Sequence, residues 1–116
     1  MRRYPCVFIA IALVLTGCTR AEKVLGRADS FPQATVAGAQ AALSGREVAV
    51  RGRLVEKCPV AGCWFVLRDE TGTIKVDTKA SGFVVLDVPV QQEVLLSGIV
   101  RGEGPNRSID AVGLRY

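Results

Sequence analysis

Two cysteines, Cys58 and Cys63, have the clearest capacity for chemistry in this chain of 116 residues. Paired thiols can form a disulfide, hold a soft metal ion such as Cu(I), or exchange electrons with another thiol. The four residues between them fit a loop that joins two antiparallel strands. Residues opposed across such strands lie close enough for a disulfide. The spacing therefore favours a structural Cys58–Cys63 disulfide.

The composition narrows the alternatives for this pair. The chain contains no histidine, the commonest metal ligand and general base. A copper site at Cys58 and Cys63 would consist of two thiolates without imidazole. A redox couple is a further alternative, although Cys-x4-Cys lacks the spacing and helix N-terminus that lower a thiol pKa in Cys-x-x-Cys oxidoreductases. Both alternatives stay open beside the disulfide.

Other signatures of catalysis are missing from the sequence. Asp69 and Glu70 are adjacent in an expected turn, where they shape the chain rather than share a proton. Gly102-Glu103-Gly104 lacks the strand-to-helix context of a phosphate-binding loop. The serines have no histidine as a base. We expect a protein that is not an enzyme and needs no cofactor.

A tryptophan and several cations share one predicted strand face. Trp64 alternates with Phe65, so a buried Phe65 puts Trp64 on the outer face. Stacking combined with positive charge can hold oligonucleotides or sugars. Alternatively, Trp64 covers the disulfide or one barrel end, and the arginines are a solvated face paired with Glu47, Glu56 or Asp77. The candidate ligand-binding residues are Trp64, Arg51, Arg53, Arg68 and Lys75.

The N-terminal segment predicts export and a lipid anchor. Met1-Arg2-Arg3 precedes an apolar run that is too short for a stable bilayer span. This run ends in Leu15-Thr16-Gly17-Cys18, which resembles the lipobox of bacterial lipoprotein signal peptides. The resemblance implies a signal peptide over residues 1–17 and fatty acylation of Cys18, of the palmitate type. An ordinary signal peptide or a membrane-embedded N-terminus is the alternative.

Location and charge limit the partners. Thr19 follows Cys18 where an aspartate would resemble an inner-membrane retention signal, so the periplasmic face of the outer membrane is favoured. Removing Arg2 and Arg3 from the 15 basic residues leaves 13 against 11 acidic ones, a net charge of +2. This charge disfavours a nucleic acid. We expect the membrane as a partner through the anchor, and an envelope protein or a small anionic ligand. The expected function is a non-catalytic binding module of unknown ligand, and a purely structural envelope adaptor is an alternative.

The remaining chain divides into a tether at residues 18–35 and a domain at residues 36–116. Residues 36–43 are alanine-rich and predict a short helix that Ser44-Gly45 would end. Alternating apolar residues then predict strands in which Val48, Leu54, Phe65 and Ile74 face a common core. Five extended segments follow from the pattern: from Val48 past Leu54, from Cys63 to Leu67, around Ile74 and Val76, at 93–101 and at 107–116.

The order of these strands resembles an OB-fold, a small five-stranded Greek-key barrel in an all-β chain with a short N-terminal helix. The resemblance is carried mainly by residues 48–52 and 67–76. A small open sandwich is the competing architecture. More narrowly, residues 58–64 are similar to the Cys-x4-Cys-Trp signature of an uncharacterised family of small secreted bacterial domains. A methionine often follows the tryptophan there, and Phe65 replaces that soft ligand here.

Overall fold

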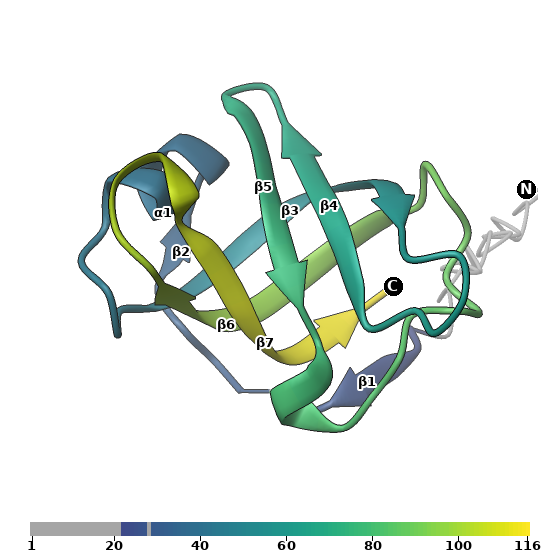
Figure 1. The fold of residues 1–116 in the computed structure, drawn as a ribbon. Helices are drawn as coiled ribbons and strands as arrows, with labels where there is room; N and C mark the ends of the chain where they lie inside the picture. Colours follow the sequence, from purple (N-terminus) through teal and green to yellow (C-terminus); the bar gives the residue numbers. More distant parts are fainter. Residues whose placement is uncertain (1–21, 28) are drawn as a thin grey trace, which may run out of the picture.

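The computed structural model describes residues 22–27 and 29–116. Its centre is a barrel of five long strands (Figure 1). In the second of them the alternation expected from the sequence is observed, since Phe65 and Leu67 are fully buried while Arg68 is exposed. The five strands are β3 (Glu47–Lys57), β4 (Trp64–Asp69), β5 (Gly72–Asp77), β6 (Glu93–Arg101) and β7 (Ser108–Arg115).

The strand pairing closes the sheet on itself. Strand β3 pairs antiparallel with both β4 and β6, β4 pairs with β5, and β6 pairs with β7. A parallel pairing of β5 with β7 completes the ring. The five-stranded Greek-key barrel predicted from the sequence is therefore confirmed, and the open sandwich is excluded.

The core lies inside this barrel. The four residues expected to meet there are all buried, with exposed fractions of 4% for Val48, 0% for Leu54 and Phe65, and 3% for Ile74. Full burial of an apolar side chain of this size contributes about 1.5–3 kcal/mol. Period-2 alternation thus identifies the residues that hold the barrel together.

The segment upstream of the barrel differs from the predicted tether. Strand β1 (Val24–Gly26) pairs antiparallel with β7, and β2 (Gln33–Ala34) pairs parallel with β3. The close approach of this segment depends on Gly113, because a Cβ there would lie 1.8 Å from the carbonyl oxygen of Arg27. The folded unit therefore begins upstream of residue 36, while the predicted signal peptide and Cys18 lie outside the described residues.

Helix α1 (Val36–Ala41) is the short helix expected before the barrel. Its N-cap is Thr35, whose hydroxyl oxygen accepts a hydrogen bond from the Gly38 N–H at 3.0 Å. The helix ends before the predicted residue 43, because Ala42 is already extended and Leu43 is 75% exposed. Another helical turn would bury no further apolar side chain, and the chain instead continues toward β3.

The crossover between β5 and β6 is irregular and contains the 3-10 turn η1 (Lys79–Ser81). Val85 and Val88 are buried in the core, whereas Leu86 is 46% exposed and Phe83 is only partly buried against the core. A second 3-10 turn, η2 (Gly104–Asn106), connects β6 to β7. In the part of the chain that the structure describes, no helix has the length and apolar character to cross a bilayer.

Candidate functional site

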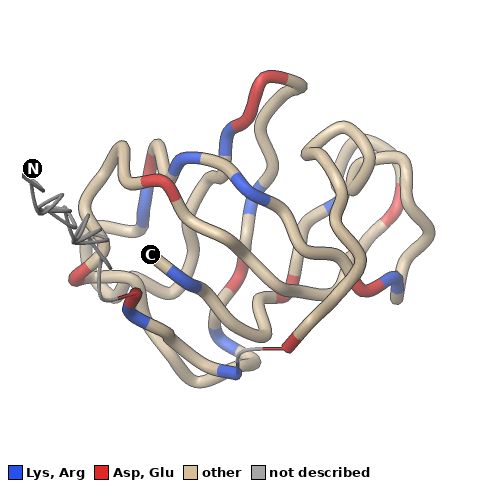
Figure 2. The backbone as a smooth tube through the Cα atoms, turned by 180° about the vertical axis from the view of Figure 1, so that it is seen from behind, with Lys and Arg blue, Asp and Glu red and all other residues tan. Residues whose placement is uncertain are grey.

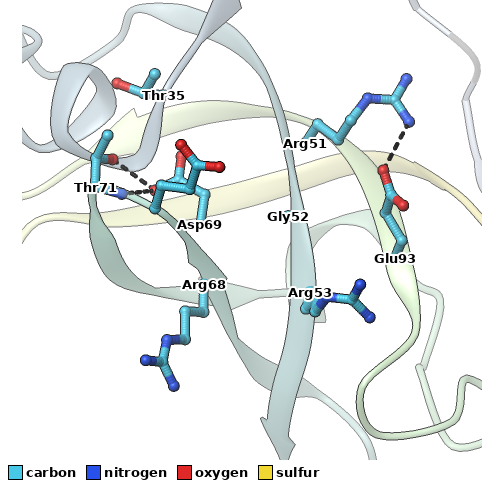
Figure 3. Close-up of a pocket in the computed structure, with 9 residues that line it drawn as sticks. Thr35, Arg51, Gly52, Arg53, Arg68, Asp69, Thr71 and Glu93 are labelled. Carbon is cyan, nitrogen blue, oxygen red and sulfur yellow. Dashed lines mark hydrogen bonds and ion pairs between the residues drawn. The ribbon is translucent and has the colours of Figure 1, made fainter.

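A groove lined mainly by charged and polar residues opens on the outer side of the barrel, along β3, β4 and the start of β6 (Figure 3). Its volume is about 600 Å³. Three arginines line it, and we call this feature the arginine groove after them: Arg51, Arg53 and Arg68. The other lining residues are Thr35, Gly52, Asp69, Glu70, Thr71 and Glu93.

Strand register places two of these arginines side by side. Arg53 of β3 is the direct cross-strand partner of Arg68 of β4, and both side chains are exposed. Like charges in directly opposed positions destabilise a sheet. Between the arginines of β3 lies Gly52, where a Cβ would meet the Arg68 carbonyl oxygen at 2.5 Å. The register therefore places Arg53 and Arg68 next to each other along the groove, and Gly52 allows β3 and β4 to approach closely there.

The partners of the three arginines differ (Figure 3). Arg51 forms an ion pair with Glu93, with Nη1 and Oε1 3.4 Å apart. The guanidinium of Arg53 donates to the carbonyl oxygen of Gln91 at 3.0 Å. Among the described residues, no carboxylate lies within ion-pair distance of Arg53 or Arg68. These two guanidinium groups are the least neutralised cations of the groove.

Asp69 lines the same groove but is engaged by the helix. Its carboxylate accepts hydrogen bonds from the Val36 N–H at 2.8 Å and from the N–H and hydroxyl of Thr71 at 2.7 and 2.6 Å. Partial burial, the largest single influence, raises the pKa of Asp69, but the bonds from Thr71, Val36 and the Gly72 amide together lower it below its usual value. Asp69 therefore remains a charged structural anchor for α1.

Trp64 and Lys75 form a separate pair on the same outer face. Lys75 is exposed, and its Nζ lies 5.4 Å from the centroid of the half-buried Trp64 ring. Arg68 is four residues further along β4, at a separation of about 13 Å for an extended strand. The structure thus groups Arg51, Arg53 and Arg68, while the ammonium of Lys75 covers the ring of Trp64. A flat ligand can stack on this ring only where Lys75 leaves it free.

The cysteine pair lies at the end of the hairpin between β3 and β4. Cys58 and Cys63 are free thiols that come within 4.1 Å of each other, so the disulfide predicted from the sequence is not formed here. Hydrogen bonds from the backbone amides of Ala61 and Val60, in that order of importance, lower the pKa of Cys58 from 9.0 to about 7. Sequence reasoning missed this effect. The glycine at position 62 was the sequence feature that could have indicated a special loop conformation, since it adopts φ +59° in the structure.

Two observations limit the chemistry available elsewhere. In residues 22–27 and 29–116, histidine, cysteine, aspartate and glutamate do not gather in groups of three or more that could hold a metal ion. Basic and acidic residues are interspersed along the chain when it is seen from behind (Figure 2). The lining of the arginine groove likewise combines its three arginines with the carboxylates of Asp69, Glu70 and Glu93.

Comparisons with known proteins agree with this barrel. A structure of the hypothetical protein ygiW from E. coli is similar with a TM-score of 0.55 and 27% sequence identity over 74% of this chain and 88% of that chain. The S. pombe Stn1–Ten1 complex shares the fold, with a TM-score of 0.61 and 13% identity over 77% of this chain and 78% of that chain. No curated protein matches. Residues 21–115 match the family described as "Bacterial OB fold (BOF) protein", which includes β1 and the whole barrel. The chain belongs to this bacterial OB-fold family.

Proposed function

We propose that this protein is a lipid-anchored periplasmic binding module that holds a small anionic ligand in the arginine groove without converting it. The observation that carries the proposal is the direct opposition of Arg53 and Arg68 across β3 and β4. Two like charges at this position cost stability in the free protein. An anion between them removes that repulsion, which is a reason for the pair to exist.

The chemistry of the groove favours a carboxylate or a phosphate. Guanidinium groups bind these anions through two parallel N–H···O bonds, which gives both strength and orientation. Trp64 lies four residues from Arg68 on the same face of β4, about 13 Å away for an extended strand. A ligand of several units can therefore place its charge at Arg53 and Arg68 and a ring near Trp64. An acidic oligosaccharide has this combination of anionic groups and flat faces.

The anchor and the location rest on the sequence. Cys18 closes a lipobox-like segment, and acylation at this position would hold the module at the periplasmic face of the outer membrane. That compartment is oxidising. Cys58 and Cys63 come within 4.1 Å of each other, and this proximity supports a disulfide between them in that compartment. The bridge would close a short loop and stabilise the module by roughly 2 kcal/mol.

Calorimetric titration of the purified protein tests the groove. The probes are a trimer of uronic acid, the neutral trisaccharide maltotriose and inorganic tripolyphosphate. We expect the uronate trimer to bind, maltotriose to bind far more weakly, and the affinity for the uronate to fall with added salt because exposed charges are screened. If tripolyphosphate binds and the uronate trimer does not, the groove is still an anion site but its ligand is not an acidic oligosaccharide.

Variants locate the site. Arg53→Gln and Arg68→Gln should each weaken binding at least about ten-fold, as expected for loss of a charge-assisted bond worth about 1.5–3 kcal/mol. The matched control is Arg101→Gln, because Arg101 is an exposed arginine that pairs with Asp110 at 3.1 Å and does not line the groove. Equal affinities for all three variants, or no binding of either anion by the parent protein, would overturn the proposal.

A further inference from the structure

The hairpin loop at residues 58–63 is held at both ends. The Cys58 N–H donates to the Trp64 carbonyl oxygen at 3.0 Å, and the Gly62 N–H donates to the Cys58 carbonyl oxygen at 3.2 Å. The Thr78 N–H donates to the Cys63 carbonyl oxygen at 2.9 Å. These bonds keep the two thiols adjacent without joining them.

The backbone amides of the loop lower the pKa of the Cys58 thiol. The amides of Ala61 and Val60 contribute most to its lowered pKa, partial desolvation opposes them, and the Gly62 amide and the Cys63 thiol add smaller effects. Every one of these groups is uncharged. Gly62 makes the arrangement possible, because it has φ +59° and a Cβ there would lie 2.9 Å from the Leu86 backbone nitrogen. The loop therefore favours the thiolate form of Cys58 through uncharged groups.

The charged side chains next to the loop are engaged elsewhere. The Lys57 ammonium donates to carbonyl oxygens at 2.7 and 2.8 Å, those of Val88 and Leu86. The Asp77 carboxylate accepts a bond from the Lys79 N–H at 2.8 Å. Both cysteines are partly accessible, and Val60 at the loop tip is 86% exposed. A small molecule in solution can thus reach the sulfurs.

From this geometry we infer that Cys58 and Cys63 form a thiol–disulfide exchange site for a low-molecular-weight disulfide, with Cys58 as the attacking thiol and Cys63 as the resolving thiol. The Cys58 thiolate attacks one sulfur of the external disulfide, which breaks the external S–S bond and releases one thiolate. Cys63 then loses its proton to water and attacks the Cys58 sulfur, which releases the second thiolate. The protein pair is oxidised to a disulfide and the external disulfide is reduced to two thiols.

This exchange goes beyond ligand binding in the arginine groove and uses none of its residues. It also makes the Cys58–Cys63 bridge a reversible bond, because two external thiols return the pair to its reduced form by the same steps. An attacking thiol works best when its pKa is near the ambient pH. Cys58, with a pKa of about 7, meets that condition at neutral pH.

The expected rate follows from the pKa. At pH 7 about half of Cys58 is thiolate, compared with about a hundredth of a thiol with a pKa of 9.0. A thiolate of lower pKa is also a weaker nucleophile, and this reduces the reaction rate about eight-fold. The net acceleration is about five- to eight-fold over the same thiol in the unfolded chain.

The test follows the reaction of the full-length protein with glutathione disulfide. In Cys63→Ser we expect a mixed disulfide with glutathione, which peptide mapping by mass spectrometry assigns to Cys58. The rate of formation of this mixed disulfide should rise with pH through a midpoint near 7. At pH 7 it should be at least about five times the rate for the same variant unfolded in urea. Cys58→Ser should react more slowly, and wild type should proceed to the internal disulfide.

Two further measurements distinguish exchange from a purely structural bridge. Trp64, the one tryptophan of the chain, adjoins Cys63 and should report a reversible transition when reduced and oxidised glutathione are varied. Gly62→Ala should raise the pKa of Cys58 and slow its reaction while circular dichroism shows an intact barrel. A bond that glutathione does not reduce, or equal rates for folded and unfolded Cys63→Ser, would overturn the inference. Neither outcome would affect ligand binding in the groove.

Discussion

Replacement of Lys57 by methionine should destabilise the barrel more than its position at the end of a strand suggests. The Lys57 ammonium donates to three carbonyl oxygens of the crossover, at 2.7 Å for Val88, 2.8 Å for Leu86 and 3.4 Å for Val85. The same segment provides Val85 and Val88, both 0% exposed, as plugs of the core. One ammonium group therefore fixes the crossover segment that packs Val85 and Val88 into the core.

The magnitude follows from the bonds that are lost. Each of the two shorter bonds contributes about 1.5–3 kcal/mol because its donor is charged. Release of the lysine side chain returns up to about 2 kcal/mol of conformational entropy. Methionine keeps the apolar stem but leaves the carbonyl groups without their donor. We expect Lys57→Met to lower the free energy of unfolding by about 2–4 kcal/mol.

Urea unfolding followed by circular dichroism measures this loss, with Lys75→Met as the matched control. Lys75 is an exposed lysine whose ammonium lies over the Trp64 ring, so its replacement should cost less than about 1 kcal/mol. Hydrogen exchange should also accelerate at the amides of Val85 and Val88, which donate to the carbonyl oxygens of Gly62 and Val85. Equal losses for both variants, or an unchanged crossover in Lys57→Met, would refute the reasoning.

Three further predictions concern the barrel and its N-terminal additions. Phe65→Ala should lower the free energy of unfolding by about 3–5 kcal/mol in the same urea assay, since the ring is fully buried; a loss below about 1 kcal/mol would contradict its place in the core. Gly113→Ala should displace β1, and hydrogen exchange should then accelerate at the amides of Lys23 and Arg27, which donate to the carbonyl oxygens of Tyr116 and Val112 at 2.8 and 3.0 Å; retained protection would contradict the close approach. Because folding lowers the pKa of Asp69, its contribution to stability is present above the ordinary aspartate pKa of 3.8 and is lost as the pH falls through the lower pKa of the folded state; Asp69→Asn should remove this part of the acid transition, and an unchanged transition would argue against the helix anchor.

The barrel strands were predictable because they bury one face each. Alternation in segments such as Trp64–Asp69 identifies both the strand and its core residues. Strands β1 and β2 were not predictable, since three and two residues give no periodic signal and their stability comes from the edges they pair with. The plugs Val85 and Val88 were missed because they lie in an apolar run outside a strand, where period 2 does not apply.

The candidate site was predictable in its residue types and less so in its arrangement. The alternation of side chains along each strand identified the outer face that carries Arg53 and Arg68. Their direct opposition depends on the register of β3 and β4, which shifts between Leu54 and Glu56. Glu93, the partner of Arg51, comes from a strand 42 residues away in the sequence. The lowered pKa of Cys58 depends on backbone amides of the loop, whose directions are not encoded in residue types.

The free energy of unfolding of Arg68→Gln, measured with and without the uronate trimer, tests the account most directly. Without the ligand, the variant should be more stable than wild type by a few tenths of a kcal/mol, up to about 1 kcal/mol, because the repulsion with Arg53 is removed. With the ligand, wild type should gain more stability than the variant and overtake it, since the intact arginine pair binds the anion at least about ten-fold more tightly. A variant that is no more stable than wild type alone and gains equally from the ligand would contradict the claim that the arginine groove is an anion site.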